Sequence, residues 1–361
     1  MHRIALAMAR GADAGKDRVR DPSGREHKRT FVFDDAFSPN WDESILGPDA
    51  RRSSRFRYWR MAREVARRNR EYDAVVSWGE KLSLAMLVAH QKTRPIKPHI
   101  AMMYQFEKPN IRVPLAAFKR HLHAVVTWSS VQRRALIEHI GYPAERVYLI
   151  RHYVDQVFYS PRAVETDTIC AVGAEMRDYA TLKQAVHGTE IPVRIAADHV
   201  RIPGRIRALR DRRVAIEDVG GPDVPGLVQG RLSATGLRDL YARSRFVVVP
   251  LLPSDTDNGI TVILEAMAMG KAVICSATRG QVDAIEHGVT GLMVPVGDAQ
   301  AMRAVIVDLW NDPARAAQMG SNARRYIERH HTLEMFTAAT RSAAEASLGD
   351  RPAPDGWWGT A

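Results

Sequence analysis

Short apolar runs alternate with amphipathic segments along most of this chain. The runs are rich in Val, Ile and Ala, a composition typical of strands buried in a parallel sheet. The expected strands are His2–Ala7, Thr30–Phe33, Asp73–Trp78, His99–Met103, Ala124–Ser129, Val147–Ile150, Thr168–Val172, Pro192–Ala196, Val214–Ile216, Phe246–Val249 and Ala272–Ser276.

The segments between these runs have helical spacing, and several of them end at a glycine. The expected helices are Trp59–Arg70, Gly79–His90, Pro114–Leu122, Val131–Ile140, Ala180–Val186, Thr235–Ser244, Ile260–Met269, Ala299–Asn311, Pro313–His330 and Leu333–Ala346. Repeated strand–helix units predict an α/β protein with doubly wound parallel sheets.

A length of 361 residues is about right for two domains. The segment Asp155–Asp167 contains Pro161 and has no periodicity, so we interpret it as the interdomain linker. We therefore predict a first Rossmann-like domain over 1–155 and a second over 156–332. A final helix over 333–348 and a loose tail over 349–361 complete the prediction.

Hydrophobic residues make up 45% of the chain, which favours a folded protein over a disordered one. No apolar run reaches the length of a membrane-spanning helix, and the apolar stretch within Met1–Arg10 is short for a signal peptide. Cys170 and Cys275 each lie in a strand-like run, which favours buried thiols over a disulfide. We expect a cytoplasmic protein, either soluble or peripheral at the inner membrane face.

The formal net charge is +11, and arginine is concentrated in the segment Arg51–Arg70, which also contains Phe56, Tyr58 and Trp59. Two interpretations stay open. The segment could bind an anionic membrane surface or an acidic acceptor, or it could be the solvated face of a helix. We do not expect a nucleic-acid partner.

The stretch Phe246–Asp298 contains the strongest functional pattern. A buried strand stops at Pro250, a polar loop ends at Gly259, and a helix leads to the next strand. The loop of such a unit opens at the carboxyl end of the sheet, where α/β proteins bind ligands. Backbone amides at Asn258 and Gly259 would lie at a helix N-terminus, which favours a phosphate.

Two carboxylates flank this helix start, because Asp257 and Glu265 are eight residues apart. Carboxylates accept hydrogen bonds from ligand hydroxyls, so this pair suits a sugar or a ribose. The alternative is that Asp257 merely stabilises the helix dipole and that Glu265 is a solvated side chain.

The segment Asp257–Gly270 resembles the Glu-x7-Glu signature of family 4 retaining glycosyltransferases, which have the GT-B fold. The run Gly280–Asp298 is similar to the family's conserved Gly-x-x-Glu-x-Ile-x-x-Gly-x-x-Gly-x-Leu-Val-x-Pro-x-Asp pattern. The resemblance implies two Rossmann-like domains across a cleft, with the acceptor on the first and a nucleotide sugar on the second. It also implies a C-terminal helix that returns to the first domain.

The resemblance implies roles for several residues of the second domain. Asp257 stands where the family's first Glu contacts the donor sugar, and Glu265 where the second Glu binds the ribose. Arg177 takes the place of the family's phosphate-binding Lys, whereas Ala174 replaces the companion Arg. Arg177 could instead pair with Asp178 or Glu175. The implied catalytic residues are Asp257 and Arg177, and the donor-binding residues are Glu265, Asn258, Gly259, Thr261 and Gly173.

On the acceptor side, Glu80 and Tyr104 follow two strands of the first domain and are candidates for an acceptor ligand or base. In the family the nucleotide base is read near Val228–Leu232, which leaves the nucleotide open. No metal-binding motif is present, so we expect a metal-independent hexosyltransferase that has no cofactor besides its nucleotide-sugar co-substrate. A small-molecule acceptor is favoured.

Two other functions remain possible. The same fold occurs in nucleotide-sugar epimerases of the UDP-N-acetylglucosamine 2-epimerase type, which need no acceptor. A non-catalytic basic binding protein could also use it.

Overall fold

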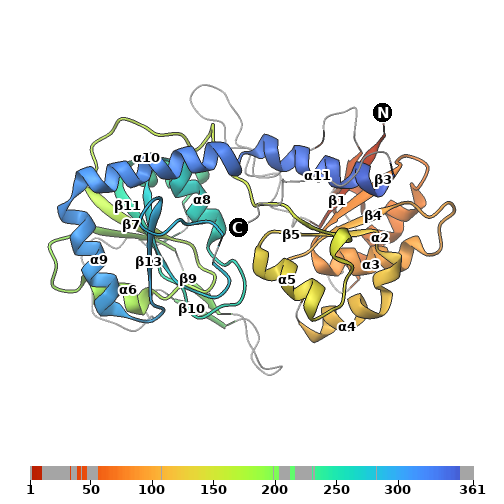
Figure 1. Cartoon of the computed structure of the whole chain (residues 1–361), viewed down its shortest axis with the longest axis horizontal. Coiled ribbons are helices and arrows are strands. Elements are labelled where there is room, and N and C mark those ends of the chain that lie inside the picture. Colours follow the sequence, from red (N-terminus) through yellow and green to blue (C-terminus); the bar gives the residue numbers. More distant parts are fainter. Residues whose placement is uncertain are drawn as a thin grey trace. The chain divides into compact units, whose positions relative to one another are not determined.

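The computed structural model describes residues 2–9, 33, 39–41, 43–46, 56–106, 108–197, 199–202, 212–215, 230, 232–281 and 283–349. These residues form two compact units (Figure 1). The first unit holds the described residues up to Arg151 and those from Glu334 onward, and the second spans His152–Leu333. Each contains a parallel sheet with helices, which confirms the predicted architecture of two parallel α/β domains.

The sheet of the first unit has six parallel strands in the order β2-β1-β3-β4-β5-β6. In chain order the strands are β1 (Ile4–Met8), β2 (Asn40–Trp41), β3 (Ala74–Trp78), β4 (His99–Met102), β5 (Ala124–Thr127) and β6 (Val147–Leu149). The helices of this unit are α2 (Arg57–Arg67), α3 (Glu80–His90), α4 (Pro109–Phe118), α5 (Ser130–Glu138) and α11 (Leu333–Ser347), with short 3-10 turns η1 (Glu43–Leu46), η2 (Lys119–His121) and η3 (Ala144–Arg146).

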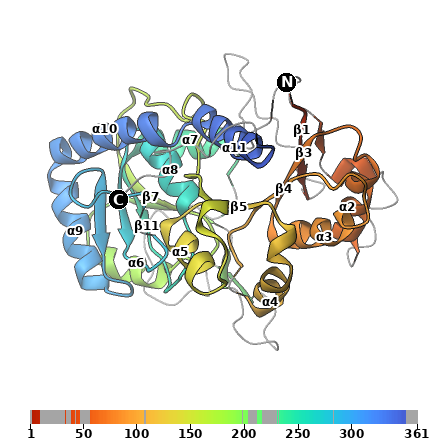
Figure 2. The ribbon, with the colours of Figure 1, turned by 45° about the vertical axis from the view of Figure 1, so that its right-hand side comes forward.

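Helices pack on this sheet through spaced apolar side chains. Met61, Ala62 and Val65 of α2 are buried, and α2 packs against α3 (Figure 2). The C-terminal helix α11 belongs to the first unit from Glu334 onward. Its Phe336 is 2% exposed, and the Phe336 ring centroid lies 6.2 Å from that of Trp78. The prediction that the last helix returns to the first domain is therefore confirmed.

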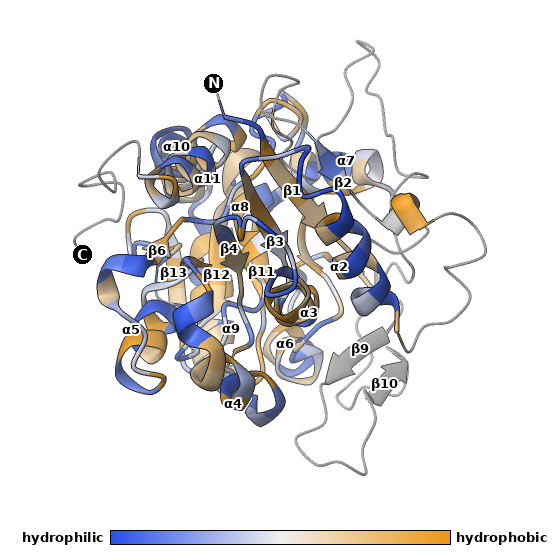
Figure 3. Ribbon diagram, turned by 90° about the vertical axis from the view of Figure 1, so that its right-hand side faces the viewer, coloured by the Kyte–Doolittle hydropathy of each residue, from blue (hydrophilic) through white to orange (hydrophobic). Residues whose placement is uncertain are grey.

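The sheet of the second unit has five parallel strands in the order β13-β12-β11-β7-β8. They are β7 (Thr168–Val172), β8 (Val193–Ala196), β11 (Ser244–Val249), β12 (Ala272–Ser276) and β13 (Gly291–Val294). The strands β11 and β12 are coloured as hydrophobic in Figure 3, as expected for strands covered on both faces. The helices are α6 (Tyr179–Val186), α7 (Ala234–Arg243), α8 (Ile260–Ala268), α9 (Ala299–Asn311) and α10 (Pro313–His330).

Four sequence predictions need correction or fall outside the described residues. Helix α4 begins at Pro109, not at Pro114, because proline is equally suited to the first turn and Pro114 lies inside the helix. The strand expected at Val214 is β10 (Arg212–Ala215), which pairs antiparallel with β9 (His199–Ile202) in a separate two-stranded sheet.

The strand predicted at Thr30–Phe33 lies outside the described residues except for Phe33, which is in no strand. The tail beyond Gly349 also lies outside them. Among the described helices, none is long and apolar enough to cross a bilayer.

Candidate functional site

In the second unit, a glycine in a left-handed conformation begins helix α8. Gly259 has a φ of 89° at the N-cap position, which side chains with a Cβ rarely adopt. A Cβ at this position would lie 2.9 Å from Val249 Cγ1. Glycine is therefore required twice, for the turn and for the close approach of the loop to β11. Helix α8 therefore begins close to the carboxyl end of β11. The amides of its first turn point out of the N-terminal end of the helix.

Arg177 lies beside this helix start and is only 4% exposed. Its Nε donates to the Val172 carbonyl over 2.9 Å, and its Nη1 donates to the Glu175 carbonyl over 2.7 Å. A Cβ built on Gly259 would lie 3.5 Å from Nη1, and one built on Gly173, where φ is +99°, would lie 2.7 Å from Nη2. The guanidinium is therefore fixed between the two glycine turns that follow β7 and precede α8.

The sequence left open that Arg177 pairs with the carboxylate of Asp178 or Glu175, and its contacts are different. Arg177 bonds the backbone carbonyl of Glu175, and the carboxylate of Asp178 accepts from the Thr181 amide over 3.1 Å as the N-cap of α6. Within the described part of the chain, Arg177 forms no ion pair with either residue. Its Nη2 donates to no described residue.

The loop that carries Asp257 is held by a glutamine from the following strand–loop segment. Gln281 is 5% exposed, and its Nε2 donates to the carbonyls of Asp257 and Asn258 over 3.0 and 2.9 Å. A Cβ at the neighbouring Gly280 would lie 2.2 Å from the Thr256 carbonyl oxygen, so only glycine permits this approach. The backbone of the loop is thereby fixed, while the Asp257 side chain is half-buried.

The other two predicted donor-binding residues of the loop differ in their surroundings. The Asn258 Nδ2 donates to the hydroxyls of Ser254 and Thr256, each over 2.6 Å. The side-chain amide nitrogen of Asn258 therefore stabilises the shape of the loop. Thr261 is exposed in the first turn of α8.

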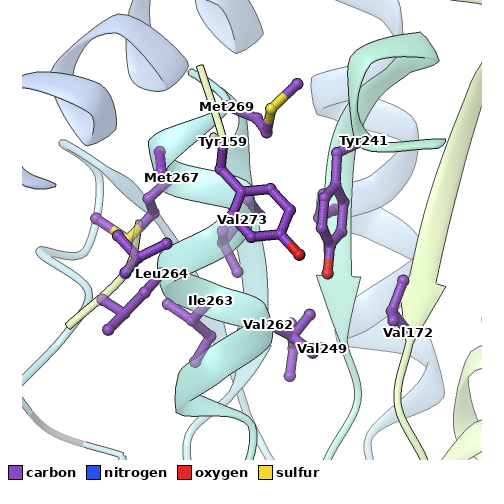
Figure 4. Packing of buried hydrophobic residues seen from close by; sticks show 14 of the residues in the cluster. Tyr159, Val172, Tyr241, Val249, Val262, Ile263, Leu264, Met267, Met269 and Val273 are labelled. Atoms are coloured by element: carbon purple, nitrogen blue, oxygen red, sulfur yellow. The ribbon is translucent and has the colours of Figure 1, made fainter. Parts of the chain in front are cut away.

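Glu265 lies in the middle of α8 and is bound by a tyrosine from α7. The Tyr241 hydroxyl donates to Glu265 Oε2 over 2.9 Å. Tyr241 is fully buried, and its ring lies beside Tyr159 and the apolar side chains of α8 (Figure 4). Burial, and next the charge of Glu265, raises the pKa of Tyr241 well above its ordinary value. The phenol therefore keeps its proton and stays a donor to the carboxylate.

In the first unit, the candidates Glu80 and Tyr104 contact each other. Glu80 is 9% exposed, and its Oε1 accepts from the amides of Tyr104 and Gln105 over 2.8 and 2.7 Å. The Tyr104 ring stacks on Trp128 with centroids 5.4 Å apart. The Glu80 carboxylate thus fixes the turn after β4, which suits a positioning role better than that of a catalytic base.

Tyr241 and Gln281 are the residues that sequence reasoning missed. Both contact a predicted site residue across more than twenty positions of sequence, so no local spacing reveals them. The region expected to read the nucleotide base, Val228–Leu232, lies largely outside the described residues. Among the residues that the structure describes, no three His, Cys, Asp or Glu side chains gather as metal ligands.

Comparison with known proteins finds glycosyltransferases that are similar to the segment with this geometry. A family model described as glycosyl transferases group 1 matches residues 223–312, which include the loop and α8. The chain is a relative of the GT-B glycosyltransferases. The resemblance found in the sequence is thus confirmed at the level of a GT-B glycosyltransferase, and the assignment to family 4 stays a prediction.

The curated relatives match about half of the chain. It is 28% identical over 215 residues to a lipopolysaccharide core biosynthesis mannosyltransferase of Rhizobium leguminosarum, a match that covers 56% of this chain and 60% of that protein. It is 25% identical over 218 residues to a D-inositol 3-phosphate glycosyltransferase of Thermobispora bispora, covering 55% and 50%. The chain therefore spans less than two thirds of the length of these relatives.

Solved structures match nearly the whole chain. A glycosyltransferase from Rickettsia africae has a TM-score of 0.70 at 13% identity and covers 97% of this chain and 100% of its own. The Anabaena protein HepE in complex with UDP and glucose has a TM-score of 0.68 at 16% identity and covers 96% and 100%. At these identities the likeness shows the fold.

Proposed function

We propose that the chain is a retaining glycosyltransferase that moves a sugar from a nucleotide diphosphate sugar to an acceptor hydroxyl. The observation that carries the proposal is the position of Arg177. Its guanidinium lies between the glycine turns at the carboxyl ends of β7 and β11, with Nη2 bonded to no described residue. Departure of a nucleoside diphosphate creates negative charge, which a fixed cation and a helix N-terminus stabilise without a metal.

The remaining residues of the second unit fit the parts of such a donor. The amides at Gly259 and in the first turn of α8, together with Arg177, suit the diphosphate. Asp257 suits the sugar hydroxyls, and Glu265, fixed by Tyr241, suits the ribose hydroxyls. The Anabaena structure was solved with UDP and glucose, and a phosphatidylinositol monomannoside mannosyltransferase of Mycolicibacterium smegmatis, 26% identical over 264 residues, depends on GDP-mannose. Both precedents support a nucleotide-sugar donor.

On the acceptor side, we propose that the turn fixed by Glu80 and bearing Tyr104 contributes to the acceptor site, and a small-molecule acceptor remains favoured. The membrane surface predicted at Arg51–Arg70 also stays a proposal. Residues 47–55 lie outside the described part of the chain. On α2, Arg67 and Arg68 each form an ion pair with Glu64, which agrees better with a solvated helix face.

A thermal unfolding assay tests the donor proposal directly. The full chain is heated with a panel of UDP-, GDP- and ADP-sugars, and the bound donor should raise the unfolding midpoint. The Glu265→Ala variant is the matched control and should lose this protection. Absence of protection by every nucleotide sugar at about 1 mM would contradict the proposal.

The assay of products separates the transferase from its alternatives. A transferase forms a glycoside only when an acceptor is present, and the anomeric configuration of the donor is kept in that product by NMR. An epimerase instead forms a free sugar or an epimer without an acceptor. A non-catalytic binding protein forms neither.

A further inference from the structure

Three buried polar side chains lie between helix α3 and the sheet of the first unit. Helix α3 packs against β3 and β4 (Figure 2). Ser77 of β3, Ser83 of α3 and His99 of β4 are each at most 1% exposed. A buried polar group costs free energy unless it is hydrogen-bonded. These three residues, which we call the polar relay, therefore need partners inside the unit.

The hydrogen bonds of the polar relay form one continuous chain. His99 Nε2 is 2.7 Å from the Ser77 hydroxyl oxygen, which is 2.8 Å from that of Ser83. The Ser83 hydroxyl donates to the Gly79 carbonyl over 2.9 Å. His99 begins β4 and pairs with Val75, whereas Gly79 follows the carboxyl end of β3. The chain of bonds therefore runs along the sheet toward its carboxyl edge.

The number of hydroxyl protons fixes the direction of these bonds. The Gly79 carbonyl can only accept, so the single proton of the Ser83 hydroxyl is used there. The Ser77 hydroxyl must then donate to Ser83 and accept from His99 Nε2. His99 is therefore the tautomer with its proton on Nε2. Its Nδ1 has no partner among the described residues, and in this tautomer it carries no proton that would need one.

The surroundings of His99 keep its ring neutral. Burial, and next the neighbouring His90 and His123, holds the pKa of His99 well below its ordinary value. The ring centroid of His90 lies 5.6 Å away, and His123 Nδ1 accepts from the His99 amide over 3.2 Å. A neutral ring has one N–H group, so at neutral pH the relay has a single arrangement.

The relay ends at the turn that carries an acceptor-side candidate. Gly79 has a φ of 95° and precedes the first residue of α3, and its amide donates to the Met102 carbonyl over 3.0 Å. The next residue, Glu80, accepts from the amides of Tyr104 and Gln105. Fixing the Gly79 carbonyl therefore fixes the start of α3, from which the Glu80 carboxylate reaches the turn after β4.

We propose that His99 is a positioning residue that orients the Glu80 turn of the acceptor side through the two serines of the relay. The relay side chains are buried, so they would act on a ligand only through this turn. The proposal rests on the acceptor role proposed above for Glu80 and Tyr104. It adds that the geometry of the turn depends on one tautomer of a histidine at the start of β4.

Nitrogen NMR of the full chain, with isotope-labelled histidine, tests the tautomer. Correlations between ring hydrogens and ring nitrogens at neutral pH should show His99 protonated at Nε2 and unprotonated at Nδ1. The spectrum of the His99→Gln variant identifies the signal by its loss. A proton on Nδ1, or exchange of the proton between both nitrogens, would overturn the proposal. The tautomer is measured on the unchanged chain, so this test holds even where a buried substitution prevents folding.

Hydrogen exchange at single amides of the full chain tests the positioning. The Ser83→Ala variant should raise the exchange rates of the Tyr104 and Gln105 amides about fivefold, which corresponds to the loss of one hydrogen bond. His99→Leu should have the same effect. His99→Gln should keep the original rates within about twofold, because its side-chain amide can still donate to Ser77.

A local effect distinguishes positioning from a general loss of stability. The amides of Leu6 and Ile150 donate to carbonyls elsewhere in the same sheet and should keep their rates in every variant. Tyr142→Phe is the matched control, because the buried Tyr142 hydroxyl donates to the Leu122 carbonyl over 2.6 Å in the same unit. This variant should leave exchange at Tyr104 unchanged.

The exchange pattern can contradict the proposal in three ways. Unchanged exchange at Tyr104 in Ser83→Ala, equal acceleration at the reference amides, or the same acceleration in His99→Gln as in His99→Leu would each do so. Thermal protection by a nucleotide sugar depends on the second unit and should survive in all relay variants. Its absence from the unchanged chain would contradict the glycosyltransferase function without altering the exchange pattern, so the two failures are distinguishable.

Discussion

Tyr241 and Glu265 form a partly buried hydrogen bond from helix α7 to helix α8, with the phenol donating to Glu265 Oε2 over 2.9 Å. The contact uses the Oε2 oxygen of the Glu265 carboxylate. Burial and the charge of Glu265 raise the pKa of Tyr241. The phenol therefore keeps its proton and stays a hydrogen-bond donor. The hydrogen bond from Tyr241 fixes the direction of the Glu265 carboxylate.

Replacing Glu265 by Ala should abolish nucleotide-sugar binding while the protein stays folded. The reason is that the variant lacks the carboxylate on α8 that we expect to accept hydrogen bonds from the ribose hydroxyls. Isothermal titration calorimetry with the donor measures the effect. A donor affinity within about twofold of that of the unchanged chain, or about 0.4 kcal/mol, would show that Glu265 does not bind the donor.

Replacing Tyr241 by Phe should weaken donor binding less than the loss of Glu265 does, on the order of fivefold to tenfold, because the carboxylate remains but is no longer oriented. Isothermal titration calorimetry with the donor measures this loss, and urea unfolding of the same variant measures its stability. A donor affinity equal to that of the unchanged chain would show that the phenol does not position Glu265 for the donor.

Replacing Arg177 by Ala should lower turnover more than it weakens donor binding. Charge on the diphosphate grows in the transition state, so a fixed cation contributes most there. We expect kcat to fall about tenfold to a thousandfold. Steady-state kinetics with varied donor concentration measure the effect, and an unchanged kcat with a raised KM would instead assign Arg177 to ground-state binding.

Much of the fold could be predicted from the sequence, because its signals are local. The strand Thr168–Val172 and the helices Ala299–Asn311 and Pro313–His330 agree with the structure at both ends, since apolar runs and capping residues mark them. Pro114 misled the prediction of α4, because a second proline at Pro109 offers the same first-turn signal.

The candidate site could be predicted only in part. Asp257, Glu265 and Gly259 lie on one short segment, so their spacing places them together. The contacts that orient them come from Tyr241 and Gln281, which the folding of α7 and of the loop after β12 brings close. Glu80 also has partners, the amides after β4, that only the sheet order reveals.

Activity should survive chelation. The cation that faces the predicted diphosphate position is the guanidinium of Arg177, and no cluster of metal-ligating side chains occurs among the described residues. The assay compares donor turnover before and after treatment with EDTA. Complete loss, restored by a divalent ion but not by dialysis alone, would require a metal in the reaction.

A pair of buried histidines should make the first unit sensitive to acid. The rings of His90 and His99 lie 5.6 Å apart between α3 and β4. His90 Nε2 is 3.0 Å from the Tyr72 hydroxyl, and His99 Nε2 is 2.7 Å from the Ser77 hydroxyl. Burial lowers the pKa of His90 to about 4 and holds the pKa of His99 well below its ordinary value.

These depressed values set the direction of the pH dependence. Between the ordinary pKa of 6.5 and a folded value of about 4, the unfolded chain binds a proton at His90 that the folded chain does not. The free energy of unfolding should therefore be highest above about pH 6.5 and should decrease as the pH is lowered toward 4. The contribution of His90 to this loss is about 3 kcal/mol.

Urea unfolding followed by circular dichroism between about pH 7 and pH 4.5 measures this dependence. The His90→Gln variant keeps a polar group near Tyr72 but cannot titrate, so its unfolding free energy should fall less steeply with acid. The slope should decrease by up to about 1.4 kcal/mol per pH unit. Equal slopes in the variant and the unchanged chain would show that His90 takes up its proton as readily in the folded chain as in the unfolded one.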